Sequence, residues 1–141
     1  MSTSPDTGPP LRIAIFNDSD VVLTTLRVWF ETHGHTARTA SVRDLQQPHE
    51  DVRQVIDAIN ADVVVYDVAL PFAASWDLLD VIRMGAGLDK IPFIVTTTNR
   101  AALDSAVHED TRAFEVTGTP ENLAELLALV RDAAAHRASD D

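Results

Sequence analysis

The feature that most constrains the fold of this chain is a regular alternation between short apolar runs and longer amphipathic stretches. The apolar runs are rich in β-branched residues and predict strands, while the stretches between them repeat apolar residues at helical spacing. Strands are predicted at residues 11–16, 36–40, 63–67, 92–98 and 112–117. Helices are predicted at residues 21–32, in the second half of 43–60, at 75–84, at 99–109 and from Pro120 onward. Such alternation predicts an α/β fold, a five-stranded parallel sheet with helices on both faces.

Length and charge limit the classes of protein to consider. The 141 residues suit one domain, which we expect at residues 11–136 between a flexible N-terminal tail, 1–10, and a C-terminal tail, 137–141. The net charge of -11 disfavours binding to nucleic acid or to an anionic membrane surface. The chain has no cysteine, and we find neither a secretory signal nor an apolar run long enough to span a bilayer. A cytoplasmic protein is the expectation.

Polar side chains follow the predicted central strands, and they are the candidate site. Asn17 and Asp18 follow the first strand, Asp67 ends the third, and Thr97 and Thr98 end the fourth. Because strands of a parallel sheet deliver such groups to one edge, we expect Asp18, Asp67 and Thr97 to converge in a shallow pocket. A simpler interpretation stays open, in which Asp67 caps a turn and Asp18 caps a helix.

Two carboxylates brought close together repel each other unless a cation or protons intervene. A hard divalent ion that prefers oxygen ligands, above all Mg2+, is the natural occupant of such a pocket. Two carboxylates, a backbone carbonyl and waters would complete its coordination, and a neighbouring hydroxyl with free backbone N–H groups could hold a phosphoryl group. His33 and His35 lie on a predicted helix-to-strand loop and are not expected to bind metal.

The sequence resembles the receiver domains of two-component response regulators over residues 11–135. The resemblance is carried by five segments in order, IAIFND, VVVYDVALP, WDLLDVIR, IPFIVTTT and TPENLAELLALV. It implies the (βα)5 receiver fold, which is flavodoxin-like. It also implies a role in phosphorelay signal transduction rather than enzymatic turnover, with phosphoryl transfer at most self-catalysed.

The resemblance implies a role for each residue of the pocket. Asp67 would be the phosphoacceptor, receiving its phosphoryl group from a histidine kinase, a phosphotransfer protein or a small acyl phosphate. Mg2+ would be bound by Asp18, Asp67, the Ala69 carbonyl and, weakly, Asn17. Thr97, with Thr98 beside it, would hydrogen-bond the phosphoryl oxygen.

Three positions depart from the receiver pattern. Asn17 stands where an acidic residue is expected, which should weaken Mg2+ binding because ligand charge helps set affinity. Thr119 stands in place of the lysine that pairs with the phosphoryl group, and the only lysine, Lys90, precedes the fourth strand. Val116 occupies the position of the switch aromatic. Arg100 is the one candidate for a substitute cation.

Two functions therefore stay open. The first is an atypical receiver that accepts a phosphoryl group on Asp67 with Mg2+ and signals through protein contacts. The alternative is a pseudo-receiver, a protein-interaction module that works without phosphorylation. A flavodoxin-like binder of small molecules or a hydrolase is disfavoured, because no cofactor motif is present. In receivers, the fourth helix, last strand and last helix commonly bind partners or a second copy, here residues 101–109 and 124–135.

Overall fold

The computed structural model describes residues 9–84 and 88–140, so the predicted N-terminal tail lies outside the described residues except for Pro9 and Pro10. Within these residues, five strands form one parallel sheet in the order β2-β1-β3-β4-β5. The strands are β1 (Arg12–Asn17), β2 (Thr36–Ser41), β3 (Val63–Asp67), β4 (Phe93–Thr97) and β5 (Phe114–Glu115). The predicted α/β fold is confirmed.

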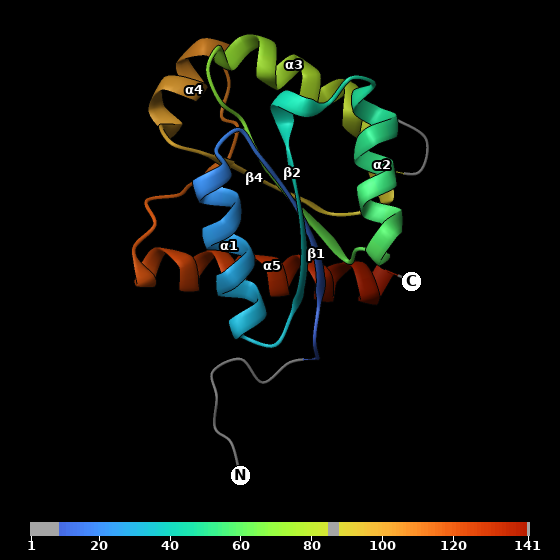
Figure 1. Ribbon diagram of the computed structural model, residues 1–141. Helices are drawn as coiled ribbons and strands as arrows, with labels where there is room; N and C mark the ends of the chain where they lie inside the picture. The colour runs from blue at the N-terminus through green and yellow to red at the C-terminus, as the bar shows by residue number, and fades with distance from the viewer. Residues whose placement is uncertain (1–8, 85–87, 141) are drawn as a thin grey trace.

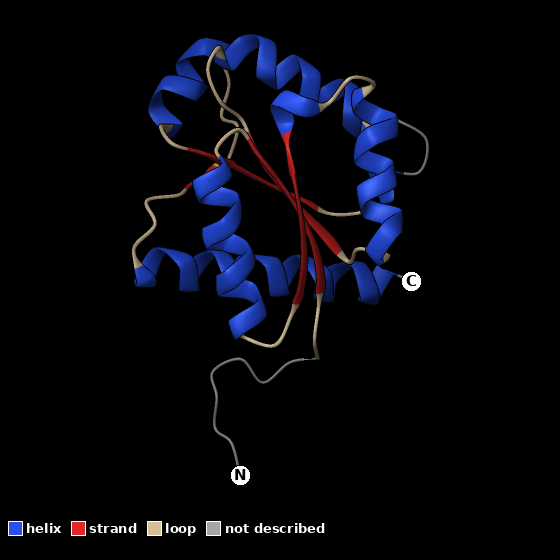
Figure 2. Ribbon diagram, viewed as in Figure 1, coloured by secondary structure: helices blue, strands red, loops and turns tan. Residues whose placement is uncertain are grey.

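Helices connect the strands and cover both faces of the sheet (Figures 1 and 2). They are α1 (Asp20–Thr32), α2 (Pro48–Ile59), α3 (Phe72–Arg83), α4 (Arg100–Val107) and α5 (Pro120–Asp140). Two short 3-10 turns, Val42–Asp44 and Leu88–Lys90, precede α2 and β4. Because all five strands are parallel, their carboxyl ends lie at one edge of the sheet.

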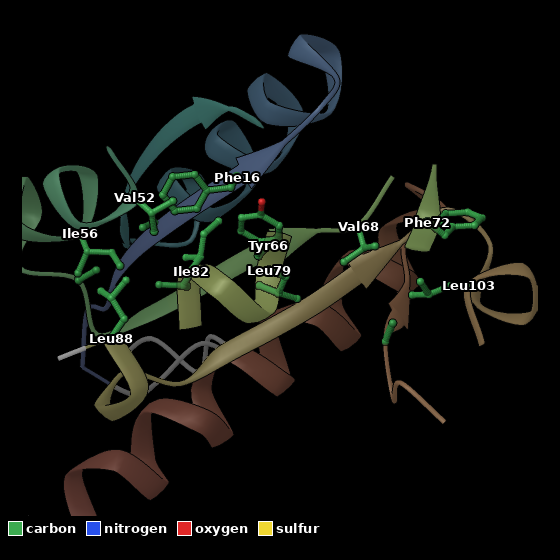
Figure 3. Close-up of a cluster of buried hydrophobic side chains, with 14 residues drawn as sticks. Phe16, Val52, Ile56, Tyr66, Val68, Phe72, Leu79, Ile82, Leu88 and Leu103 are labelled. Carbon is green, nitrogen blue, oxygen red and sulfur yellow. The ribbon is translucent and has the colours of Figure 1, made fainter. Parts of the chain in front are cut away.

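Each face of the sheet has its own hydrophobic core. On one face α2, α3 and α4 pack against the sheet, and Figure 3 shows side chains of this core, including Phe16 and Tyr66 of the strands and Leu103 of α4. On the other face α1 and α5 pack against Ile13, Ile15 and neighbouring strand residues. All five residues of β3 are buried, which explains why its sequence, VVVYD, does not alternate between apolar and polar residues.

Some boundaries differ from those predicted. The last strand has two residues rather than six, and it begins only at Phe114 because Arg112 adopts a left-handed conformation (φ 56°) that a strand cannot include. α3 begins at Phe72, directly after the proline, rather than at Ser75. α5 continues to Asp140, so the predicted tail at 137–141 is helical over its described part. No helix among the described residues is long and apolar enough to cross a membrane.

A candidate site at the carboxyl edge of the sheet

Strand register gathers a row of polar side chains at the carboxyl edge. Asn17 of β1 pairs with Ser41 of β2, and Asp67 of β3 pairs with Thr96 of β4. Phe16 pairs with Tyr66, so Asn17 and Asp67 come next along their adjacent strands. Paired residues of parallel strands point to the same face of the sheet. The row therefore lies on the face covered by α1 and α5, and a single carboxylate stands near its centre.

Asp67 is buried and hydrogen-bonded. Its side chain is only 4% exposed, and the Thr96 hydroxyl donates to its Oδ1 at 2.9 Å. Burial raises the pKa of Asp67 to about 6, the Thr96 hydrogen bond opposes this rise, and the negative charge of Asp18 adds to it. Among the described residues, no basic side chain forms an ion pair with Asp67. A group with a strongly shifted pKa at such an edge is a candidate functional group.

The hydroxyl that contacts Asp67 belongs to Thr96, not to Thr97. Successive residues of a strand point to opposite faces, so only one of the two can share a face with Asp67. Thr97 is buried, and its hydroxyl accepts a hydrogen bond from the N–H of Asn99 at 3.3 Å. Thr98 follows the strand and is exposed. Thr96 was not identified from the sequence. What identifies it is the pairing of β3 with β4, in which Asp67 lies opposite Thr96.

The β1–α1 loop organises Asn17 and Asp18 differently from each other. Asn17 is buried, and its side-chain oxygen accepts a hydrogen bond from the N–H of Ser19 at 2.8 Å. Ser19, not Asp18, caps α1, because its hydroxyl accepts the N–H of Val22. Asp18 instead forms an ion pair with Arg43, which follows β2, at 3.3 Å. The alternative role of Asp18 as a helix cap is therefore wrong.

The predicted Mg2+ ligands are engaged with protein groups. The Asn17 oxygen, the Asp18 carboxylate and the Asp67 carboxylate each already have a partner. The N–H of Ala69 donates to the Ser75 hydroxyl, which ties down the loop that would supply the backbone carbonyl. No group of three or more His, Asp or Glu side chains in residues 9–84 and 88–140 is arranged to hold a metal ion. This donor set does not fit Mg2+ as it stands.

Thr119, in place of the expected lysine, caps the last helix. Its carbonyl accepts the N–H of Leu123 at 2.9 Å, and its hydroxyl accepts the N–H of Asn122 at 3.2 Å. The Asn122 side chain in turn accepts the N–H groups of Thr117 and Gly118 and donates to the Glu115 carbonyl. A neutral capping network therefore fills the corner where receivers place a positive charge.

Arg100, the candidate substitute cation, is held elsewhere. Its guanidinium lies 2.7 Å from Asp110 and 3.5 Å from Asp104. The Asp110 contact is the largest cause of the raised pKa of Arg100. Its backbone N–H donates to the Glu115 carboxylate at 2.8 Å. These contacts hold the charge of Arg100 on the α4 side of the last strand.

The residue directly after β5 is Val116, which is aliphatic. Val116 is half-buried, and its N–H donates to the Thr97 carbonyl at 3.0 Å. Phe114 packs into the core between the sheet and α1 and α5. That Val116 stands at the position of the receiver switch aromatic stays a prediction.

No protein-family model matches this sequence, and no curated protein matches it. Its likeness to known proteins lies in the fold, which is that of CheY-like response-regulator receiver domains. Eight solved structures that it resembles are between 14% and 23% identical to it in sequence. Identities this low establish a shared fold and nothing more.

Three solved structures illustrate the likeness. A sensor protein from Polaromonas sp. JS666 superimposes with a TM-score of 0.67 at 14% identity, over 92% of this chain and 99% of its own. A transiently phosphorylated switch in bacterial signal transduction gives 0.62 at 23%, over 90% and 96%. The chemotaxis response regulator CheY4 of Vibrio cholerae gives 0.61 at 17%, over 86% and 99%.

Proposed function

We propose that this protein is a receiver-fold signalling module that works through protein contacts, without phosphorylation of Asp67. The observation that carries the proposal is the arrangement of charge around Asp67. Thr119 offers a neutral capping hydroxyl, and Arg100 is engaged by Asp110 and Asp104. Among the described residues, no basic side chain forms an ion pair with Asp67 itself.

The lack of a basic partner for Asp67 matters because phosphoryl transfer requires charge balance. A phosphoryl group carries about -1.5 to -2 charges near neutral pH, and its transfer depends on cations that neutralise the transition state. The pKa of Asp67, about 6, already reflects the cost of a buried negative charge. Further negative charge at this position, with Asp18 nearby, would be disfavoured unless a cation accompanied it.

A second function is favoured by one observation, the hydrogen bond between Thr96 and Asp67. This places a hydroxyl where it could contact a phosphoryl group on Asp67, supplied by a histidine kinase or a phosphotransfer protein. The likeness to a transiently phosphorylated switch is compatible with it. In this second proposal the protein is still no enzyme, because the phosphoryl group would be accepted and not turned over.

The partner that we propose is a cytoplasmic protein bound by the surface of α4, β5 and α5. This surface exposes small side chains, Ala101, Ser105, Ala106, Ala124 and Ala128, beside the partly exposed Leu129. Small side chains allow close approach of another backbone, and a second copy of this chain is the alternative occupant. The acidic charge of the protein argues against nucleic acid or an anionic membrane.

Incubation with acetyl phosphate and Mg2+, followed by intact-mass measurement, tests the proposal. We expect no mass gain for the wild-type protein. Matched samples of Asp67→Ala and of the double variant Asn17→Asp/Thr119→Lys, which restores the expected charges, provide the controls. A gain of one phosphoryl group in the wild-type protein that is lost in Asp67→Ala would establish the second function instead.

A further inference from the structure

Arg43 is a basic side chain that lies beside Asp18 at the carboxyl edge of the sheet. It lies in the 3-10 turn Val42–Asp44 directly after β2, which pairs with β1. The carboxyl ends of these adjacent strands bring Arg43 to the β1–α1 loop. Its Nε lies 3.3 Å from Asp18 Oδ1, and its terminal nitrogen lies 3.8 Å from Asp20 Oδ2. One guanidinium thus bridges two carboxylates at the start of α1.

These contacts occupy the carboxylate on which a divalent cation would most depend. With Asn17 neutral, Asp18 is the remaining charged ligand candidate from β1 and its loop. The Asn17 oxygen also accepts the N–H of Ser19, so it would have to give up this hydrogen bond to bind a metal ion. A metal ion would therefore displace Arg43 from Asp18 and also sit close to a positive charge.

We propose that Arg43 is the built-in counter-ion of Asp18 and Asp20 and excludes divalent metal from Asp18. The inference rests on the proposed function in one respect: without a phosphoryl group on Asp67, the site has no need of a divalent cation. The position of Arg43 explains how Asp18 is compensated without metal, and it assigns a role to a residue outside the predicted ligand set. Arg43 is well exposed (62%), so its removal should leave the fold intact.

The expected gain in metal affinity when Arg43 is removed follows from the positive charge of its guanidinium. An exposed ion pair is weak by itself, but a divalent ion placed a few ångströms from a guanidinium is also repelled by it. Removing Arg43 eliminates both the competition for Asp18 and the repulsion. We expect the dissociation constant for Mn2+ or Mg2+ to fall about tenfold or more.

Mn2+ binding followed by water-proton relaxation, with Mg2+ as competitor, tests this inference. The samples are the wild-type protein, Arg43→Gln and Arg27→Gln. The last is a matched control, because it removes the same charge from an exposed ion pair with Glu31 on α1. Arg43→Gln should bind at least about tenfold more tightly than the other two, and adding Asp18→Asn should abolish the gain.

Equal Mn2+ affinities for Arg43→Gln, Arg27→Gln and the wild-type protein would overturn the inference. So would a gain that survives Asp18→Asn, because the metal would then bind elsewhere. The measurement contains no phosphodonor, so its outcome is independent of whether Asp67 accepts a phosphoryl group. A mass gain in the wild-type protein would overturn the proposed function without deciding the role of Arg43. Equal Mn2+ affinities would overturn the role of Arg43 without deciding the proposed function.

Discussion

The centre of the carboxyl edge and the corner between β5 and α5 are built from different chemistry. At the centre, β3 and β4 hold a buried carboxylate against a hydroxyl, Asp67 against Thr96. At the corner, Thr119 and Asn122 form a neutral network that caps a helix. The centre therefore keeps an acidic group that is costly to ionise, while the corner lacks the cation that would offset it. The comparison shows a buried carboxylate at the centre and a neutral network at the corner, and our proposed function rests on this arrangement.

The largest expected effect concerns the cost of the central carboxylate. Because burial raises the pKa of Asp67 from 3.8 to about 6, the group favours folding at low pH, and this contribution is lost as the pH rises through about 6. Asp67→Asn should therefore raise the free energy of unfolding by roughly 2–3 kcal/mol at pH 8 and by roughly 1 kcal/mol at pH 4.5. Urea unfolding at the two pH values measures the difference.

The matched control for this prediction is Asp80→Asn, which changes an exposed carboxylate on α3. It should alter stability by no more than about 0.5 kcal/mol at either pH. If Asp67→Asn destabilises the protein at pH 8, or has the same effect at both pH values, the carboxylate is not under the strain of burial that the comparison assumes.

The next effect concerns the corner. The Asn122 amide accepts the N–H groups of Thr117 and Gly118 at 2.8 and 3.3 Å and donates to the Glu115 carbonyl at 3.0 Å. Asn122→Ala should lower the free energy of unfolding by roughly 1–2 kcal/mol and speed amide exchange at Thr117 and Gly118. Glu121→Ala, at the exposed neighbouring position, is the control. Unchanged exchange in Asn122→Ala would mean that the network does not order this corner.

A smaller effect separates the two adjacent threonines. Thr96→Val removes a hydrogen bond that lowers the pKa of Asp67, so this pKa should rise above its present value of about 6. Thr97→Val removes a contact with Asn99 and should leave the pKa of Asp67 unchanged. Each variant should cost about 1 kcal/mol of stability. A carboxyl 13C titration measures the pKa of Asp67 in both variants. A change of this pKa in Thr97→Val but not in Thr96→Val would favour the sequence prediction, that Thr97 is the residue of the site, over the strand register.

The smallest effect concerns Arg100. The Arg100 hydrogen bond is the largest cause of the lowered pKa of Asp110, so Arg100→Ala should raise that pKa. It should leave the pKa of Asp67 and any response to phosphodonor unchanged, because the guanidinium is held by Asp110 and Asp104. Carboxyl 13C titration of both aspartates checks this. A change at Asp67 would show that Arg100 reaches the central carboxylate after all.

The sequence was sufficient for the fold because local and global signals agree. The β-branched run at residues 63–67 predicts a doubly buried strand, and the structure has β3 at Val63–Asp67. The last strand begins later than predicted. Arg112 has a left-handed conformation, and its N–H donates to the Asp110 carboxylate, which β-propensity does not predict. The local sequence pattern thus predicts where the strands and helices lie, while tertiary contacts determine some of their boundaries.

The site was less predictable, because its partners come from distant parts of the chain. The convergence of Asn17 and Asp67 follows from strand order, which the alternating pattern implies. The choice between Thr96 and Thr97 depends on the exact register of β3 with β4, and a shift by one residue reverses it. The pairing of Arg43 with Asp18 has no sequence signal, because it depends on how the turn after β2 meets the β1–α1 loop.

The most direct test of the central claim is whether the pocket is coupled to the proposed partner surface. Backbone amide spectra recorded with and without beryllofluoride and Mg2+, which mimic a phosphorylated aspartate, measure that coupling residue by residue. We predict that the amides of residues 101–109 and 124–135 do not shift. Saturable shifts across both segments that disappear in Asp67→Ala would contradict the account and show that the pocket still operates as a phosphorylation switch.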